Sequence, residues 1–289
     1  MKAGVQFSKK PAEWLLTAPP LLWLGVFFVI PTVLILGTAL RPADLHGGLA
    51  EGWSLEAVRA MTDAVYPPIW WRTLWMSAAT TLLCLLIALP VGWHLARLTR
   101  RWQGIVLLLL TLPFLTNFLI RVFAWKSLLH PEGALTRLCL ALGWMSEEQQ
   151  LLYNAGSVLA VLVYVHLPFA ILPVYAAAEK FDFSLLDAAR DLGAGALRGF
   201  VSVFIPGVRG GIGAGALMVF TGCLGQYVVP QIVGGTEDEM IGSKIAQRAF
   251  SDRNLPEAAA LTGVLLLAML VPLLMLAWRR KGATTNGHE

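Results

Sequence analysis

The stretch that decides the fold is EKFDFSLLDAARDLGAGALRGFVSVFIP, residues 179–206, the one long polar segment with a helical pattern. Ser184 begins the pattern, and Asp187 follows three residues later, which is the capping-box spacing of a helix N-terminus. The apolar residues after it recur every three or four positions and form one stripe: Leu185, Leu186, Ala189, Leu192, Ala196, Leu197 and Phe200. The sequence therefore predicts an amphipathic helix between two apolar segments.

Two glycines interrupt this helix. Gly193 and Gly195 weaken the middle of the segment, so we expect two short helices joined by a bend. The stripe needs a cover, and two covers fit the pattern. One is the lipid headgroup layer, on which an interfacial helix would lie, and the other is a second protein.

A motif inside the stretch resembles that of a known family. Asp187-Ala188-Ala189 is followed by Gly193 and then by Val203-Phe204-Ile205-Pro206. This series resembles the E-A-A-x3-G-x9-I-x-L-P loop of ATP-binding-cassette importer permeases, with similar residues at the three positions that differ. In that family the loop is cytoplasmic and docks into the ATP-hydrolysing subunit.

The resemblance implies a coupling role for the loop at 179–205. It assigns these residues to contact with the ATPase: Ser184, Asp187, Ala188, Ala189, Gly193, Phe200 and Pro206. Asp187 is one methylene shorter than the family's glutamate. Its carboxylate also has the structural role of the capping box, and the two roles are compatible.

Composition indicates a membrane protein. Of 289 residues, 57% are apolar and 14% are charged, whereas roughly a quarter are charged in soluble domains. Aspartate and glutamate are missing from five windows that coincide with the apolar runs: 14–43, 64–131, 149–178, 192–236 and 258–288. These windows predict membrane-embedded segments. The net charge of +4 then reflects membrane topology, and we expect no nucleic-acid partner.

Six apolar segments are long enough to cross a hydrocarbon core of about 30 Å at about 1.5 Å per residue. They lie at about 14–40, 70–96, 104–129, 154–178, 206–229 and 257–278. The first is about twice as long as the apolar core of a cleaved signal peptide, so we interpret it as a span. We expect one all-α integral membrane domain over residues 1–289.

The distribution of lysine and arginine predicts the orientation. The N-terminus, 97–103, 179–203 and the tail from Arg279 form one set of segments, which carries most of the basic residues: Lys2, Lys9, Lys10, Arg97, Arg100, Arg101, Lys180, Arg190, Arg198, Arg279, Arg280 and Lys281. The other set, at 41–69, 130–150 and 230–256, carries fewer of them and most of the acids: Arg41, Arg59, Arg137, Lys244, Arg248 and Arg253. Both termini and the coupling stretch are therefore expected in the cytoplasm.

Glycines open the fifth expected span. Gly211 and Gly215 form the G-x-x-x-G spacing that lets another helix approach closely. Gly211, Gly213 and Ala216 also satisfy G-x-G-x-x-A, but no strand precedes them and they lie in an apolar span. Close helix packing is the interpretation that fits.

The sequence carries no recognisable catalytic chemistry. It has no G-x-x-x-x-G-K-[ST] motif, no paired nucleophile and base, and no metal-ligand spacing among its dispersed histidines and its single cysteines, Cys84, Cys139 and Cys223. We expect no catalytic residue, no metal site and no cofactor on this chain. A transporter driven by ATP would have to take its ATPase, with ATP and Mg²⁺, from another chain.

Two further stretches resemble spermidine/putrescine permeases. Residues 116–125, TNFLIRVFAW, are similar to the T-S-x-L-I-R-x-Y-x-W stretch of that group. Residues 224–230, LGQYVVP, followed by Gly234-Gly235, are similar to its L-G-x-F/Y-x-x-P…G-G stretch, and the likeness continues through 241–248. Polar residues inside spans are costly and mark candidate substrate paths. The candidates are Asn117, Arg121, Trp125, Gln226 and Tyr227.

Each of these candidates has a structural alternative. In a straight third span, Arg121 and Trp125 would lie about 26–32 Å from its cytoplasmic start, at the outer interface. There Arg121 could simply extend toward the headgroups and Trp125 could belong to the interfacial aromatic belt. Gln226 and Tyr227 would lie at a similar depth, and their flanking glycines favour a path over lipid exposure.

Together, the resemblance implies a type I ABC importer permease fold with six transmembrane helices, N-in and C-in, in a bacterial inner membrane. It implies an ATPase dimer, a second permease chain and a periplasmic binding protein as partners, and a polyamine as substrate. Iron(III), sulfate or a phosphonate is the alternative cargo. An ion-coupled secondary transporter would show inverted repeats and buried acids, neither of which the sequence contains.

Overall fold

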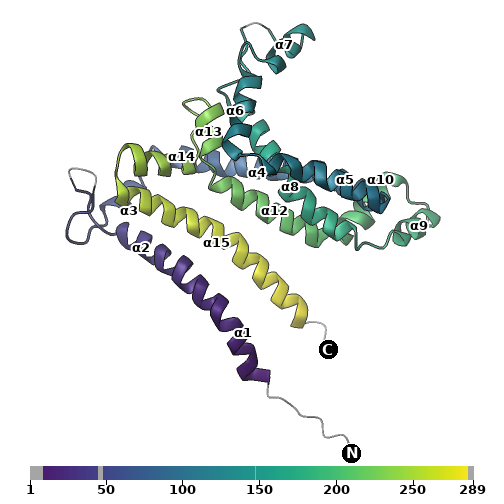
Figure 1. The fold of residues 1–289 in the computed structure, drawn as a ribbon, viewed down its shortest axis with the longest axis horizontal. Coiled ribbons are helices and arrows are strands. Elements are labelled where there is room, and N and C mark those ends of the chain that lie inside the picture. Colours follow the sequence, from purple (N-terminus) through teal and green to yellow (C-terminus); the bar gives the residue numbers. More distant parts are fainter. Residues whose placement is uncertain (1–8, 45–47, 147, 286–289) are drawn as a thin grey trace, which may run out of the picture. The chain divides into compact units, whose positions relative to one another are not determined.

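The computed structural model describes residues 9–44, 48–146 and 148–285, with side chains over 17–44, 48–146 and 148–271 (Figure 1). Within these ranges every regular element is a helix, and a single antiparallel bridge joins Ala43 and Leu49. The predicted all-α fold is confirmed. By its contacts the chain divides into two compact units, one of Met1–Asp63 and Gln247–Val264, the other of Ala64–Ala246 and Leu265–Glu289.

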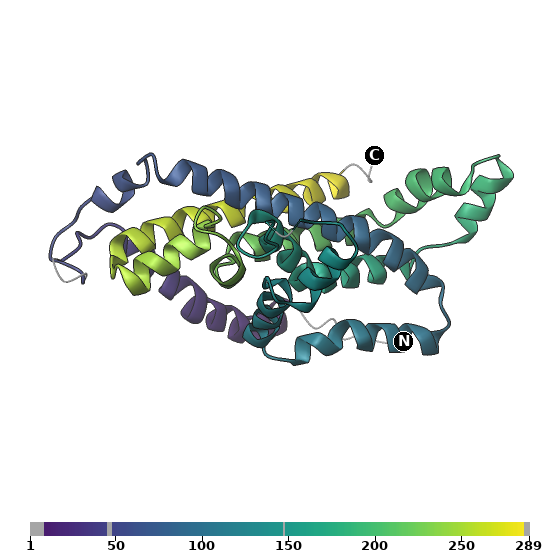
Figure 2. The same ribbon diagram turned by 90° about the horizontal axis from the view of Figure 1, so that it is seen from above.

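The core of the larger unit is a bundle of three helices, α4 (Tyr66–Arg97), α8 (Ala155–Ala178) and α12 (Arg209–Leu224), which pack against one another (Figures 1 and 2). Small side chains let the helices approach. A Cβ at Gly211 would collide with the carbonyl oxygen of Pro173, and one at Gly215 would lie 3.2 Å from that of Ala170. The close packing predicted from G-x-x-x-G is thus the packing of α12 on α8.

Several helices have the length and apolar character of membrane spans. Among the described residues three single helices qualify, at Thr17–Thr38, Tyr66–Arg97 and Ala155–Ala178. Two pairs of sharply bent helices raise the number to five if each pair is one span, and Leu255–Val271 is apolar but shorter. The second and fourth expected spans are therefore continuous helices.

The third expected span is not a straight helix. It consists of α5 (Arg100–Thr111), the 3-10 turn η2 (Leu112–Leu115) and α6 (Phe118–Leu129), and α7 (Ala134–Ala141) follows α6. The segments Arg100–Leu115 and Phe118–Ala141 meet at 92°. Pro113 tightens the end of α5, Thr116 is extended, and the Asn117 side chain accepts the Leu119 N–H to start a new helix. The depth expected for Arg121 and Trp125 from a straight helix is therefore wrong.

The fifth expected span is shorter than 206–229. The helical segments Ala196–Gly207 and Arg209–Leu224 meet at 73°, and the continuous helix α12 runs only from Arg209 to Leu224. Three non-helical residues then lead into α13 (Val228–Val233), and α14 (Ile241–Ala246) follows. The sequence patterns predicted neither short helix.

The smaller unit contains α1 (Lys9–Leu24), the π-turn η1 (Gly25–Val29), α2 (Ile30–Thr38), α3 (Glu56–Ala60), η4 (Gln247–Ser251) and the first turns of α15 (Leu255–Thr285). Its small core is formed by alanines at the end of α2, in α3 and in α15: Ala39, Ala57, Ala259 and Ala260.

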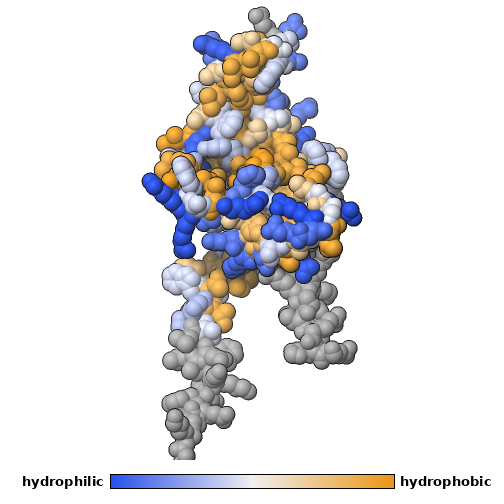
Figure 3. Space-filling model, turned by 90° about the vertical axis from the view of Figure 1, so that its right-hand side faces the viewer, coloured by the Kyte–Doolittle hydropathy of each residue, from blue (hydrophilic) through white to orange (hydrophobic). Residues whose placement is uncertain are grey.

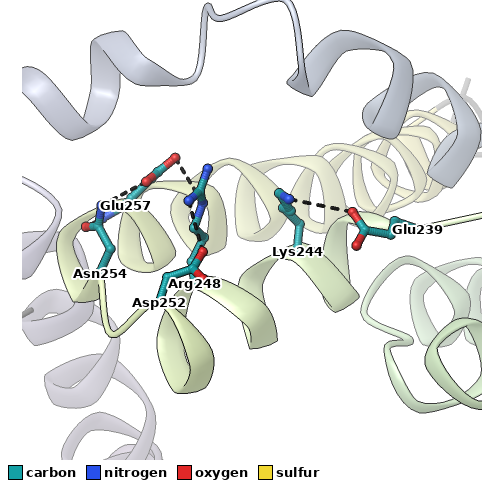
Figure 4. Close-up of polar contacts among 6 residues, drawn as sticks. All are labelled: Glu239, Lys244, Arg248, Asp252, Asn254 and Glu257. Carbon is teal, nitrogen blue, oxygen red and sulfur yellow. Dashed lines mark hydrogen bonds and ion pairs between the residues drawn. The ribbon is translucent and has the colours of Figure 1, made fainter. Parts of the chain in front are cut away.

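Charged side chains close the turn between η4 and α15. Arg248 pairs with Asp252 at 2.9 Å and with Glu257 at 3.3 Å, and Asn254 donates to Glu257 at 2.9 Å (Figure 4). Because each charge in this group faces an opposite charge or a hydrogen-bonding partner, the acid at the start of α15 is accommodated by local pairing.

Candidate functional site

The stretch that dominates the sequence forms an arm, which we define as α9 (Ser184–Asp191), α10 (Ala196–Gly199), the π-turn η3 (Phe200–Phe204) and α11 (Ile205–Gly207). Gly193 lies between α9 and α10 with a φ of +83°, a conformation that favours glycine. The prediction of two short helices joined by a bend is confirmed.

The start of the arm differs from the predicted capping box. The Asp182 carboxylate accepts the backbone N–H of Ser184 at 3.0 Å, so the aspartate two residues before Ser184 provides the cap. Hydrogen bonds from the Ser184 hydroxyl and, second, from its backbone N–H lower the pKa of Asp182 below its ordinary value. Asp187 does not reach back to the helix start. Instead its carboxylate pairs with Arg190 at 2.9 Å on the exposed surface.

The base of the arm is an aromatic cluster on α4. The ring of Trp93 lies edge-on to those of Phe183, Phe200 and Phe204, with centroids 5.8, 5.2 and 4.7 Å away. Phe204 is fully buried, and Phe181 adds a further edge contact to it at 5.4 Å. Aromatic pairs of this geometry each stabilise by about 0.5–1.5 kcal/mol beyond burial. We call these five rings the Trp93 cluster.

The same cluster constrains its surroundings. Arg97, one turn beyond Trp93 on α4, lies over the Trp93 ring at 5.6 Å and over Phe183 at 5.8 Å. A Cβ at Gly207 would collide with the ring of Phe181, so only glycine fits there. The arm is therefore held to the end of α4 by tightly packed rings.

The apolar stripe of the arm does not stay on one face. Leu186 is buried against the base, and Phe200 packs there too. Leu192 and Leu197 point away from the base and are 90% and 77% exposed. Leu185 is 51% exposed. The left-handed residue at Gly193 breaks the helical phase, so the continuous stripe predicted from the sequence is wrong. The bend divides it into an inward set and an outward set.

The outward set lies among charges. Ser184, Asp187, Ala188, Gly193 and Pro206 are all exposed, and Ala189 is half-buried. Figure 3 faces the end of the larger unit that carries α9 and α10, and hydrophobic residues lie there among hydrophilic ones. Three exposed leucines in such a setting are typical of a protein-binding surface.

Gln226 and Tyr227 lie in the non-helical break between α12 and α13. The α14 segment packs directly on this break, because a Cβ at Gly242 would lie 2.7 Å from the Gln226 carbonyl oxygen. Ser243 donates to the Tyr227 carbonyl at 3.2 Å. Gln226 is half-buried, and the Tyr227 side chain is 44% exposed. The break is thus fixed on one side and open on the other.

The break is also tied to the core. Thr73 on α4 accepts the N–H of Ile241 at 2.8 Å, and Ser157 on α8 donates to the carbonyl of Val233 at 2.7 Å. Helix α13 packs against both α6 and α8. The structure therefore places the two groups of path candidates on neighbouring elements, α6 and the break before α13.

The candidates on α6 have different surroundings. Asn117 is exposed and acts as the cap of α6. The Arg121 guanidinium lies over the Phe114 ring at 4.5 Å. Trp125 is half-buried, with its ring 5.3 Å from that of Tyr164. Asn117 and Trp125 therefore have structural roles whether or not they contact a substrate.

Sequence reasoning missed the Trp93 cluster. The signal was the density of phenylalanines at 181, 183, 200 and 204 around one tryptophan at the end of an expected span. Within the described ranges no three His, Cys, Asp or Glu side chains come together as metal ligands.

The comparisons with known proteins define the class. Residues 84–281 match the family model described as binding-protein-dependent transport system inner membrane component. The chain therefore belongs to this family, the inner-membrane permeases of ABC importers.

Particular relatives carry more specific names. The chain is 34% identical over 257 residues to the spermidine/putrescine transport system permease protein PotB of Escherichia coli (strain K12). The aligned region covers 89% of this chain and 93% of PotB. It is 33% identical over 264 residues to PotB of Haemophilus influenzae (strain ATCC 51907 / DSM 11121 / KW20 / Rd), covering 91% and 92%.

Solved structures share the fold. A bacterial ABC transporter involved in the import of the acidic polysaccharide alginate has a chain that superposes with a TM-score of 0.67 at 13% identity, over 96% of this chain and 98% of that chain. The alginate transporter in complex with an alginate pentasaccharide-bound periplasmic protein gives 0.69 at 14%, over 93% and 95%. At this identity the likeness shows the permease fold alone.

Proposed function

We propose that this chain forms the translocation path for a polyamine of the putrescine and spermidine class. The observation that carries the proposal is the likeness to PotB over almost the full length of both chains. The aromatic and amide groups next to the non-helical break suit such a cargo, because ammonium groups bind aromatic faces and carbonyl oxygens.

The arm is the part that would receive force from ATP hydrolysis. Its exposed leucines would dock into a groove on an ATPase subunit, and the Trp93 cluster would pass the displacement to α4. The ATP and Mg²⁺ would be held by that subunit. The complete importer would contain two such ATPases, a second permease chain and a periplasmic binding protein.

The topology we propose has six spans with both termini in the cytoplasm. The bias of lysine and arginine supports it, as does the position of the arm, which must lie on the side where ATP is available. Reporter fusions test it. A reporter enzyme that works only outside the cytoplasm should be active when it is joined within 48–63. A cytoplasmic signal there would contradict the orientation.

Uptake of labelled putrescine and spermidine tests the substrate. We expect uptake by the wild-type complex, and a fall of between about twofold and thirtyfold for Tyr227→Ala if one cation–π contact is lost. Phe250→Ala, at a ring that is 80% exposed in the smaller unit, is the matched control. A wild-type complex that transports no polyamine would reject the proposal.

One observation favours an anion. Arg121 is a basic side chain beside the candidate path, and its region of the chain contains no acid to offset it. Sulfate or a phosphonate is therefore the second candidate cargo. Labelled sulfate belongs in the same uptake assay, and its transport in place of polyamine would identify this alternative.

Docking of the arm has its own test. Asp187→Arg and Leu192→Asp should leave the protein in the membrane but remove the ATP hydrolysis that substrate-loaded binding protein stimulates. Leu138→Asp is the control, because Leu138 is an exposed leucine of α7, outside the arm. A stably assembled Asp187→Arg complex with normal stimulation would rule out a docking role for this surface.

A further inference from the structure

Arg121 is a charged side chain that pairs with no acid among the described residues. It lies in the first turn of α6, and its guanidinium covers the Phe114 ring at 4.5 Å and approaches Phe118 at 5.8 Å. Its Nε and Nη1 atoms are buried and form no hydrogen bond with any described residue. A guanidinium has five N–H donors, so much of its bonding capacity is unused.

This arrangement is unfavourable for an isolated chain. A desolvated charge is costly unless it is paired and hydrogen-bonded, and contact with one ring offsets only part of that cost. The first turn of a helix also disfavours a positive charge, because the helix dipole is positive there. The windows 64–131, 149–178 and 192–236 contain no aspartate or glutamate, so the helices around Arg121 offer no carboxylate.

The residues beside Arg121 are also uncovered. Leu115 is 81% exposed, Thr116 is exposed and extended, and the exposed Asn117 begins the new helix. Non-helical backbone within a membrane is stable only against protein or water, since lipid tails cannot satisfy its polar groups. The exposed leucines on either side, Leu112 and Leu119, suit contact with protein more than contact with water.

We propose that the second permease chain of the importer covers the break at 115–117 and presents a carboxylate to Arg121. A carboxylate can accept two parallel N–H bonds from one guanidinium, which would satisfy the buried nitrogens together. The inference rests on the proposed two-permease assembly. It also removes a difficulty, because an unpaired guanidinium beside the path would repel a polyamine, whereas a paired one would not.

A charge exchange across the interface tests this directly. The tagged chain is purified in mild detergent, without substrate, together with its second permease. Mass spectrometry then identifies the sequence of that second permease. Arg121→Glu should lower recovery of the second permease at least about tenfold, because two carboxylates would then face each other. Each Asp and Glu of the second permease is next changed to Lys in the Arg121→Glu background, and one such change should restore recovery.

The control variant lies on a different helix. Arg137→Glu, at an exposed arginine of α7, should leave recovery unchanged. Normal recovery of the second permease with Arg121→Glu would overturn the proposal, and lost uptake in that intact complex would assign Arg121 to the cargo instead. Recovery that is lost in detergent but normal in nanodiscs of anionic lipid would also overturn it, in favour of a lipid phosphate. Recovery of the second permease is measured without substrate, so it tests this proposal separately from the proposed substrate.

Discussion

The arm and the break at 115–117 both interrupt helices, but they do so by different means. The arm bends at Gly193, and packed rings hold its base. What it exposes is a set of leucine side chains. At 115–117 the chain leaves the helix through an extended Thr116, and all three residues are exposed. A side-chain surface can stay in water until a partner arrives. Under the proposal above, the residues at 115–117 are instead covered by the second permease chain.

Removal of the ring at the centre of the Trp93 cluster should have the largest effect. Phe204→Ala leaves a cavity where a fully buried ring contacts Trp93, and we expect a loss of about 3–5 kcal/mol in the free energy of unfolding. Thermal unfolding of the purified complex measures it, with limited proteolysis of the arm as the local readout. Phe250→Ala is the exposed control. Equal stability of Phe204→Ala and wild type would mean that the rings do not hold the arm.

The bend at Gly193 should come next. Gly193→Ala forces a side chain into a φ of +83°, at a cost of about 1–2 kcal/mol, and Gly193→Pro is expected to be worse because its φ is fixed near −65°. Gly195→Ala is the matched control, since Gly195 has a φ of −67° and open space around it. Stimulated ATP hydrolysis should fall for Gly193 variants only. Equal effects at both glycines would show that the bend is unimportant.

The break should be less sensitive to a single side chain. Asn117→Ala removes the cap of α6 and should cost about 1 kcal/mol, whereas Asn117→Ser should keep most of the stability because serine also caps helices. Thermal unfolding of the purified complex distinguishes the two. If the alanine and serine variants were equally destabilised, the capping role would be incorrect and Asn117 would matter in another way.

The smallest effect concerns pH. The hydrogen bonds from Ser184 lower the pKa of Asp182, so their stabilisation of α9 is complete above the ordinary value of 3.8 and is lost as pH falls through the lower folded value. The protection factor of the Ser184 amide, which is its exchange rate corrected for the pH dependence of an unfolded peptide, should therefore fall in acid. Ser157 is the control, because its N–H is accepted by the uncharged amide of Asn154 at 2.9 Å. Parallel behaviour of the two amides would contradict the assignment.

Hydropathy predicted the continuous helices, and glycine predicted the bend of the arm. The sequence pattern could not predict where a proline breaks a helix. Pro90 lies inside α4, and Pro168 and Pro173 lie inside α8, yet those helices continue. Pro113 ends a helix because Asn117 can cap a new one soon after it. The outcome depends on the residues that satisfy the freed backbone, and these are recognised only once the packing is known.

Parts of the candidate site were also predictable from local sequence, and parts depend on packing. The position of the arm follows from its motif, whereas the split of its apolar stripe depends on how Gly193 rotates α10 relative to α9. The contact between α6 and α13 joins segments about a hundred residues apart, and no local pattern encodes it. The Trp93 cluster was missed for the same reason, since the partners of Trp93 lie beyond helices α5 to α8 in the chain.

The Trp93 cluster also imposes an order on biosynthesis. Trp93 leaves the ribosome long before Phe183, Phe200 and Phe204, and the chain between them includes α5 to α8. Its ring cannot be covered until Phe204 has been translated, so the end of α4 remains an open aromatic surface through most of membrane insertion. Closure of that surface therefore marks the moment at which the arm acquires its packed base.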